Sequence, residues 1–134
     1  MGSHEVIVLD THVFIWYALN DPQIDAGVSH RLAESPRDVS VPSICAWEAM
    51  MLVQKGRLLI DGDDPSATFR EYIRASGFVE VPLNTEIAML SRTLEFSHED
   101  PADRFIAATA YALGAKLATS DSRLRKLPWI ELAY

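Results

Sequence analysis

The sequence contains a single cysteine, Cys45, which lies among apolar neighbours in the segment SICAW. One cysteine cannot form an internal disulfide, and it cannot build a cysteine-rich metal site. The histidines show no ligand spacing such as HxxxH, so a zinc site is not expected from His4, His12, His30 and His98. Any metal ion in this protein is therefore expected to be held by oxygen ligands.

The sequence also lacks a long apolar run. The longest candidate, VIVLDTHVFIWYAL, is interrupted by Asp10 and His12 and falls short of the ~18 apolar residues of a membrane span. Residues 1–4, MGSH, lack the regions of a secretory signal, and we interpret them as a tag remnant or a disordered N-terminus. We expect a soluble, cytoplasmic protein with no membrane partner, whose folded domain spans residues 5–134.

Positive charge is scarce as well. Twelve lysines and arginines stand against 19 acidic residues, which gives a formal net charge of -7. This balance argues against nucleic-acid binding, because contacts to phosphate depend on lysine and arginine. The objection weakens if several of the acids bind metal ions, since their charges are then neutralised in the working protein.

The sequence does contain enough apolar material for one compact core. Its 134 residues are 49% hydrophobic, and this length is typical of a single domain. Buried strands are predicted at residues 5–10, 38–42, 78–83, 116–121 and, as a last short one, 129–133. Helices are predicted at residues 12–20, 27–35, 44–56, 61–77, 85–96 and 100–114. This alternation indicates an α/β fold with a mostly parallel central sheet and helices on both faces.

Two acids end predicted strands. Asp10 comes after VIVL, and Asp121 comes after KLAT with one serine between. Ligands of parallel α/β sheets bind beyond the carboxyl ends of the strands, so both acids are expected at that edge. Each also has a purely structural interpretation, because Asp10 is well placed to cap a helix and SDSRLRK is typical of a polar turn.

Glu48 interrupts an apolar stripe on the helix predicted at 44–56. The stripe is formed by positions with helical spacing, namely Ile44, Trp47, Met51 and Leu52. A carboxylate on a packed helix face is unfavourable unless it meets an arginine, a network of hydrogen-bond donors or a cation. The sequence leaves these three partners open.

The stretch HEDPADRFIAATA places two acids around a proline at the head of an apolar run. One interpretation is structural: the stretch is a helix start with Asp100 at the N-cap, Pro101 at the first helical position and Asp103 two residues later. The other interpretation is chemical: the same helix start would hold Asp103 rigidly towards the sheet edge, where it could bind a metal ion. The two interpretations are compatible, because a capping residue can also position a ligand. Ser43 is likewise expected to cap the helix at 44–56.

Four motifs in this order resemble those of PIN-domain ribonucleases, in particular the VapC-type toxins of VapBC toxin–antitoxin pairs. They are VLDTHVFIW, ICAWEAMMLVQKGRL with Trp47 and Glu48, DPADRFIAATA, and LATSD. Each motif alone is weakly specific, but the set covers nearly the whole chain. The resemblance implies a single PIN-like domain at residues 5–134.

By position in these motifs, the resemblance assigns the family's metal-binding and catalytic acids to Asp10, Glu48, Asp103 and Asp121. It leaves Asp100 as a cap and outer contact, and it places Thr11, Arg104 and Ser120 beside the metal or the substrate. Basic residues next to the motifs are suited to phosphate, although they serve equally well as ordinary solvated charges: Lys55, Arg57, Arg104, Arg123, Arg125 and Lys126.

The implied activity is that of an endoribonuclease, which hydrolyses RNA phosphodiesters with one or two Mg²⁺ or Mn²⁺ ions. Carboxylates without His or Cys do prefer such hard cations. Two divalent ions would neutralise the charge of the four acids and bring the net charge from -7 to about -3, which weakens the objection to RNA binding. The family also implies a VapB-type antitoxin as partner and a homodimer, which we expect to use apolar helix surfaces such as those around Trp16 and Tyr17.

One alternative function stays open. A PIN-like domain can bind RNA or protein while its site is catalytically idle, and sequence alone does not separate such a module from an enzyme with a narrow RNA target. The presence of all four acids favours catalysis.

Overall fold

The structure of the protein is a computed structural model that describes residues 5–134, so the interpretation of residues 1–4 lies outside the described part of the chain. At its centre is a parallel sheet with the strand order β3-β2-β1-β4. The strands are β1 (Ile7–Leu9), β2 (Val39–Pro42), β3 (Val79–Val81) and β4 (Lys116–Ala118). The predicted parallel α/β fold is confirmed.

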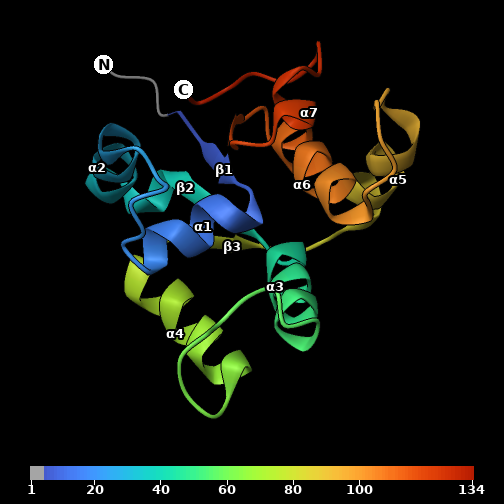
Figure 1. The fold of residues 1–134 in the computed structure, drawn as a ribbon. Helices are drawn as coiled ribbons and strands as arrows, with labels where there is room; N and C mark the ends of the chain where they lie inside the picture. The colour runs from blue at the N-terminus through green and yellow to red at the C-terminus, as the bar shows by residue number, and fades with distance from the viewer. Residues whose placement is uncertain (1–4) are drawn as a thin grey trace.

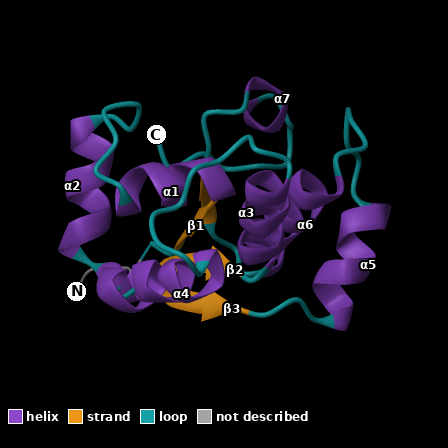
Figure 2. Ribbon diagram, turned by 60° about the horizontal axis from the view of Figure 1, so that its bottom comes forward, coloured by secondary structure: helices purple, strands orange, loops and turns teal. Residues whose placement is uncertain are grey.

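Helices cover the sheet. They are α1 (Thr11–Ala18), α2 (Ala26–Glu34), α3 (Ile44–Gln54), α4 (Pro65–Ser76), α5 (Thr85–Thr93), α6 (Pro101–Ala112) and α7 (Ser122–Arg125), with the 3-10 turn η1 (Pro36–Asp38) before β2. Figure 1 shows α1, α2 and α4 on one side of the sheet and α5 and α6 on the other. Figure 2 shows the strands enclosed by these helices. Within residues 5–134, no helix has the length and apolar character needed to cross a membrane.

The two central strands carry the core. β1 and β2 are buried along their whole lengths, which is typical of parallel strands covered on both faces. On α1, Phe14 is fully buried and lies edge-on to Phe69 of α4, with 5.4 Å between ring centroids. Residues that directly follow β1 therefore start from a fixed backbone at the carboxyl edge of the sheet.

Most of the helices are capped at their N-termini by an aspartate or an asparagine side chain. In each case a side-chain oxygen accepts a hydrogen bond from a backbone N–H of the first turn, which satisfies a donor that the helix itself cannot pair. The residues that cap in this way are Asp10, Asp25, Asp64, Asn84, Asp100 and Asp121. The predicted caps at Asp10 and Asp100 are confirmed, and Asp121 also caps a short helix.

Two expectations for α3 were wrong. Ser43 makes no capping hydrogen bond, because its backbone is already helical (φ -58°, ψ -26°) rather than extended. The buried face of α3 is formed by Cys45 and Ala49, whereas Trp47 is 53% exposed. These small residues allow close packing, since the Cys45 thiol lies 3.7 Å from the carbonyl of Leu9 in β1. Glu48 therefore stands at the border of the packed face and is half-buried.

The last predicted strand, at 129–133, is reduced to a single parallel bridge between Leu117 and Leu132. The indole of Trp129 instead donates to the carbonyl of Glu95, at 2.7 Å, and packs edge-on against Phe96. This anchor holds the start of the segment against the end of α5, so that only its final residues reach β4.

Arg104 on α6 is buried and ties α6 to the end of α5. Its Nε donates to the carbonyl of Ser91 at 2.8 Å, and its Nη1 donates to the carbonyl of His98 at 3.1 Å. The guanidinium also lies over the ring of Phe96, 4.4 Å from the centroid. These contacts indicate that Arg104 has a structural role in packing. The resemblance had placed this residue beside the metal or the substrate.

Replacement of Arg104 by leucine should lower the free energy of unfolding by about 2 kcal/mol or more, because two largely buried carbonyls lose their donors. Denaturant unfolding measures this loss. The matched control is Arg92→Leu on α5, whose exposed ion pair with Glu99, at 3.2 Å, should contribute at most about 1 kcal/mol. Equal losses in the two variants would contradict the packing role.

Candidate metal and nucleic-acid site

Asp10 lies at the end of β1 and is almost fully buried. One carboxylate oxygen accepts from the backbone N–H of Val13, at 3.1 Å, and the other accepts from the hydroxyl of Thr119. Burial raises the pKa of Asp10, and these two hydrogen bonds only partly oppose that effect. The side chain is thus fixed in direction while its negative charge is poorly solvated.

Glu48 reaches the same edge from α3. Its Oε1 accepts a hydrogen bond of 2.5 Å from the hydroxyl of Thr11, the first residue of α1. Burial raises the pKa of Glu48, an effect that the Thr11 hydrogen bond opposes and the negative charge of Asp100 reinforces. The sequence left an arginine, hydrogen-bond donors or a cation open as partners of Glu48, and the structure shows a hydroxyl donor. Within residues 5–134, no arginine forms an ion pair with this carboxylate.

The start of α6 brings Asp100 and Asp103 to Glu48. Asp100 caps the helix by accepting from the backbone N–H of Asp103, at 3.2 Å. Burial raises the pKa of Asp103 to about 6, and the nearby charge of Asp100 adds to this shift. Ligand oxygens of Glu48, Asp100 and Asp103 lie within 4.8 Å of one another. Asp100 is therefore as well placed to bind a cation as the acids chosen by resemblance.

Asp121 closes the group from the end of β4. Burial tends to raise its pKa, but hydrogen bonds from Arg123 outweigh this effect and lower it. The Arg123 guanidinium donates to Asp121 Oδ2 at 3.1 Å and to Asp103 Oδ2 at 3.3 Å. This half-exposed arginine thus bridges two of the acids and partly compensates their charge.

All five acids line one cavity of about 330 Å³. The structure brings together the predicted site residues Asp10, Glu48, Asp103 and Asp121, and it adds Asp100 on equal terms. The rest of the lining includes the predicted Thr11 and Ser120, together with His12, Trp16 and Arg123. Arg104 is not part of the lining.

The sequence patterns do not point to two residues that shape this site, Thr119 and His98. Thr119 lies next to Asp10 because β4 pairs with β1 in the register Leu9 to Ala118. A hydroxyl residue just before Ser120 and Asp121 is the only signal that could have suggested it. His98 Nε2 lies 3.0 Å from Asp103 Oδ2, a contact that its sequence spacing from the other histidines does not reveal.

The model of the PIN domain family matches residues 7–130 of the chain. The chain belongs to the PIN domain family. This match covers all four strands and every acid of the cavity, so the resemblance carried by the four motifs is confirmed.

Similarity to individual proteins agrees with the assignment to the PIN domain family. The chain is 29% identical over 121 residues to Ribonuclease VapC22 of Mycobacterium tuberculosis, a match that covers 89% of each protein. Among solved structures, it is similar to DNA-bound VapBC from Salmonella typhimurium (TM-score 0.68, 19% identity, 96% of each chain). It is also similar to FitAcB from Neisseria gonorrhoeae (TM-score 0.62, 22% identity, 95% of this chain and 96% of that one). At such low identity these structures show the PIN fold alone.

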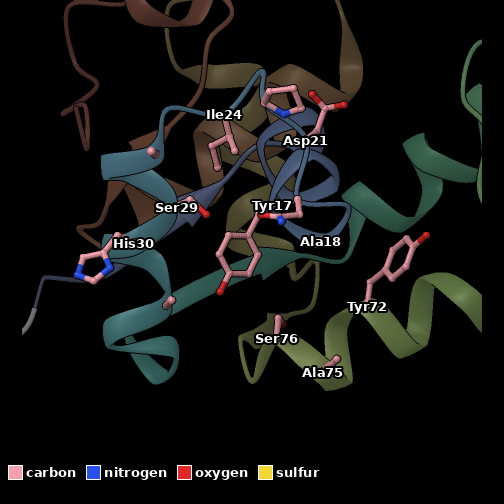
Figure 3. Close-up of a pocket in the computed structure, with 13 residues that line it drawn as sticks. Tyr17, Ala18, Asp21, Ile24, Ser29, His30, Tyr72, Ala75 and Ser76 are labelled. Atoms are coloured by element: carbon pink, nitrogen blue, oxygen red, sulfur yellow. The ribbon is translucent and has the colours of Figure 1, made fainter.

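A second and larger cavity, of about 650 Å³, lies between α1, α2 and α4. Figure 3 shows its lining, with Tyr17, His30 and Tyr72 around it. Among residues 5–134, Asp21 is the only carboxylate in the lining, so the described part of this cavity has no cluster of acids that could hold a metal ion. Tyr17 also packs on Phe78, whereas Trp16 lines the acidic cavity, so the two residues expected at a dimer surface face different parts of the molecule.

The chemistry of the acidic cavity suits a hard divalent cation. Its charged ligands are all carboxylates, with hydroxyl groups from Thr11 and Ser120 nearby. The raised pKa values of Asp10, Glu48 and Asp103 indicate that their ionised forms are destabilised as the protein stands. A cation among them would relieve this cost, so the residues fit Mg²⁺ or Mn²⁺.

Replacement of Asp103 by asparagine should separate its two roles. In chelator, Asp103→Asn should melt at the same or a higher temperature than the wild type, because one of several mutually repelling charges is removed. With Mn²⁺, it should lose most of the stabilisation that the ion gives the wild type. Thermal melts with and without Mn²⁺ measure both effects.

The chain provides a matched control in Asp64, which caps α4 before Pro65 as Asp100 caps α6 before Pro101. Asparagine caps nearly as well as aspartate, so Asp64→Asn should keep the full Mn²⁺ shift. Asp100→Asn should lose part of it because of its place in the cluster. If Asp103→Asn melts lower in chelator and keeps its Mn²⁺ shift, Asp103 serves only the helix start.

Proposed function

We propose that this PIN domain is a Mg²⁺- or Mn²⁺-dependent endoribonuclease that acts in the cytoplasm as the toxin of a VapBC-type pair. The observation that carries the proposal is the convergence of Asp10, Glu48, Asp100, Asp103 and Asp121 on one cavity at the carboxyl edge of the sheet. The name of the related Ribonuclease VapC22 and the toxin–antitoxin assemblies among the similar structures support it.

The acids would hold one or two ions, with Asp10 central and the others sharing the remaining positions. A bound divalent ion supplies a nucleophilic water at neutral pH and charge stabilisation for the phosphodiester during in-line displacement. The chain keeps the carboxylates oriented for this task through Thr11 on Glu48 and Thr119 on Asp10. The expected products carry 5′-phosphate and 3′-hydroxyl ends.

The rim of the cavity offers groups for RNA itself. His12 and Trp16 lie on one side of it, with 6.0 Å between their ring centroids, and aromatic rings of this kind stack on unpaired bases. Arg123 bonds to Asp103 and Asp121 and carries a half-exposed guanidinium that can turn to a phosphate. The aromatic rings favour single-stranded or looped RNA as the substrate, and the arginine favours a phosphate in general.

Replacement of Asp10 by asparagine should reduce RNA cleavage by about 100-fold or more, since even residues that only support metal ligands are worth about 10–100-fold. Sequencing of 5′-phosphate RNA ends after expression of the chain measures cleavage. Asp25→Asn at the exposed cap of α2 is the control and should cleave normally. Undiminished cleavage after thorough chelation would overturn the metal mechanism, and a wild type that binds Mn²⁺ without cleaving RNA would favour the idle binding module.

A small antitoxin encoded beside this protein should inhibit it by placing an arginine or lysine among the acids. The bridging position of Arg123 indicates that the cavity accommodates a guanidinium. Alanine in place of the inserted residue should restore cleavage while the complex still forms, as measured by co-purification and RNA cleavage together. An antitoxin that inhibits without a basic residue near the acids would contradict this expectation.

The homodimer remains a prediction. Trp16 and Tyr17 line separate cavities, so they are poor candidates for its surface. Trp47 on α3 and Met89 on α5 are more than half exposed, and we propose them as the better candidates for a dimer surface.

A further inference from the structure

His98 lies in the loop between α5 and α6, directly behind Asp103. Its side chain is only 9% exposed and does not line the acidic cavity. Its Nε2 lies 3.0 Å from Asp103 Oδ2, and its backbone carbonyl accepts from the buried guanidinium of Arg104. The backbone of His98 is thus bonded to Arg104, and its ring is bonded to Asp103 Oδ2.

Packing does not account for a histidine at this position. The other ring nitrogen, Nδ1, is buried without a hydrogen-bond partner in the part of the chain that the structure describes. An unpaired buried polar atom is unfavourable, and an apolar side chain of similar size would avoid it. The contact of Nε2 with Asp103 is what the imidazole provides and an apolar residue would not.

The direction of this contact follows from the chemistry of the two groups. An ionised carboxylate only accepts hydrogen bonds, so Nε2 carries the hydrogen and donates to Asp103 Oδ2. The guanidinium of Arg123 donates to the same oxygen, at 3.3 Å. Two donors on Oδ2 fix the plane of the carboxylate and leave Oδ1 to bind a cation.

We propose that His98 is a positioning residue, whose Nε2–H holds Oδ2 of Asp103 so that Oδ1 is presented to a divalent cation beside Glu48 and Asp100. The proposal rests on the proposed function, because it requires that the acids bind a metal ion. Groups that orient ligands in this way raise metal affinity by about 10–100-fold. A role limited to packing would change stability and leave metal affinity as it is.

The test compares three replacements of His98 by titration of the purified protein with Mn²⁺, followed by electron paramagnetic resonance of the free ion. His98→Leu should raise the Mn²⁺ dissociation constant by about tenfold or more. His98→Gln should restore binding to within a few-fold of the wild type, since its amide nitrogen reaches the place of Nε2. His98→Asn, whose shorter side chain mimics Nδ1, should bind as weakly as His98→Leu.

Two controls separate the possible failures. His30→Leu removes an exposed histidine that pairs with Glu34 far from the acids, and its Mn²⁺ affinity should equal that of the wild type. Asp103→Asn should bind most weakly. If the wild type itself binds no Mn²⁺, the proposed metal site fails.

Wild-type affinity in His98→Leu, with binding lost in Asp103→Asn, would overturn the positioning role while leaving the metal site intact. Equal affinities of His98→Gln and His98→Asn would overturn it as well, because a bond from the place of Nε2 would then have no special effect. The comparison of these two polar variants holds even if His98→Leu fails to fold.

Discussion

The repulsion among five carboxylates that meet at one edge of a parallel sheet constrains the groups around the site. Asp10 and Asp103 are buried and Glu48 is half-buried, and burial weakens the solvation that would otherwise screen their charges. Three of the five have raised pKa values for this reason. Such a cluster is stable only because other groups on neighbouring elements are aimed at the same oxygens.

The compensation comes mainly from helix starts and short hydroxyl side chains. Asp10, Asp100 and Asp121 each accept from a backbone N–H at the beginning of a helix, where the partial positive charge of the helix favours an anion. Thr11 and Thr119 donate to Glu48 and Asp10 from adjacent strand ends. These donors hold direction without adding net positive charge, so a divalent cation would still find an attractive field in the cavity.

The predictable part of the site follows from local rules. Asp10 and Asp121 stand where strand patterns end, so the sequence alone places them at the sheet edge, and the capping pattern around Pro101 places Asp100 at a helix start. Glu48 lines the cavity, but the pattern that singled it out was partly wrong, because the apolar stripe around it is not the buried face of α3. The helical periodicity of apolar residues predicts which face is buried from hydrophobicity alone. In the structure, the buried face of α3 instead contains the small residues Cys45 and Ala49, which allow close packing.

The rest depends on pairings between distant parts of the chain. Thr119 meets Asp10 across 109 positions of sequence through the register of β4 on β1, and no local pattern encodes that register. Arg104 shows the opposite case, in which a motif residue beside a site acid is turned away by the packing of α6 on α5. The buried guanidinium of Arg104 bonds the end of α5 and also the carbonyl of His98, whose ring contacts Asp103. The packing of α6 on α5 therefore also positions the loop that carries His98. In this fold, the contacts of Arg104 with the end of α5 and with His98 therefore link the packing of α6 to the surroundings of Asp103, although neither Arg104 nor His98 lines the cavity.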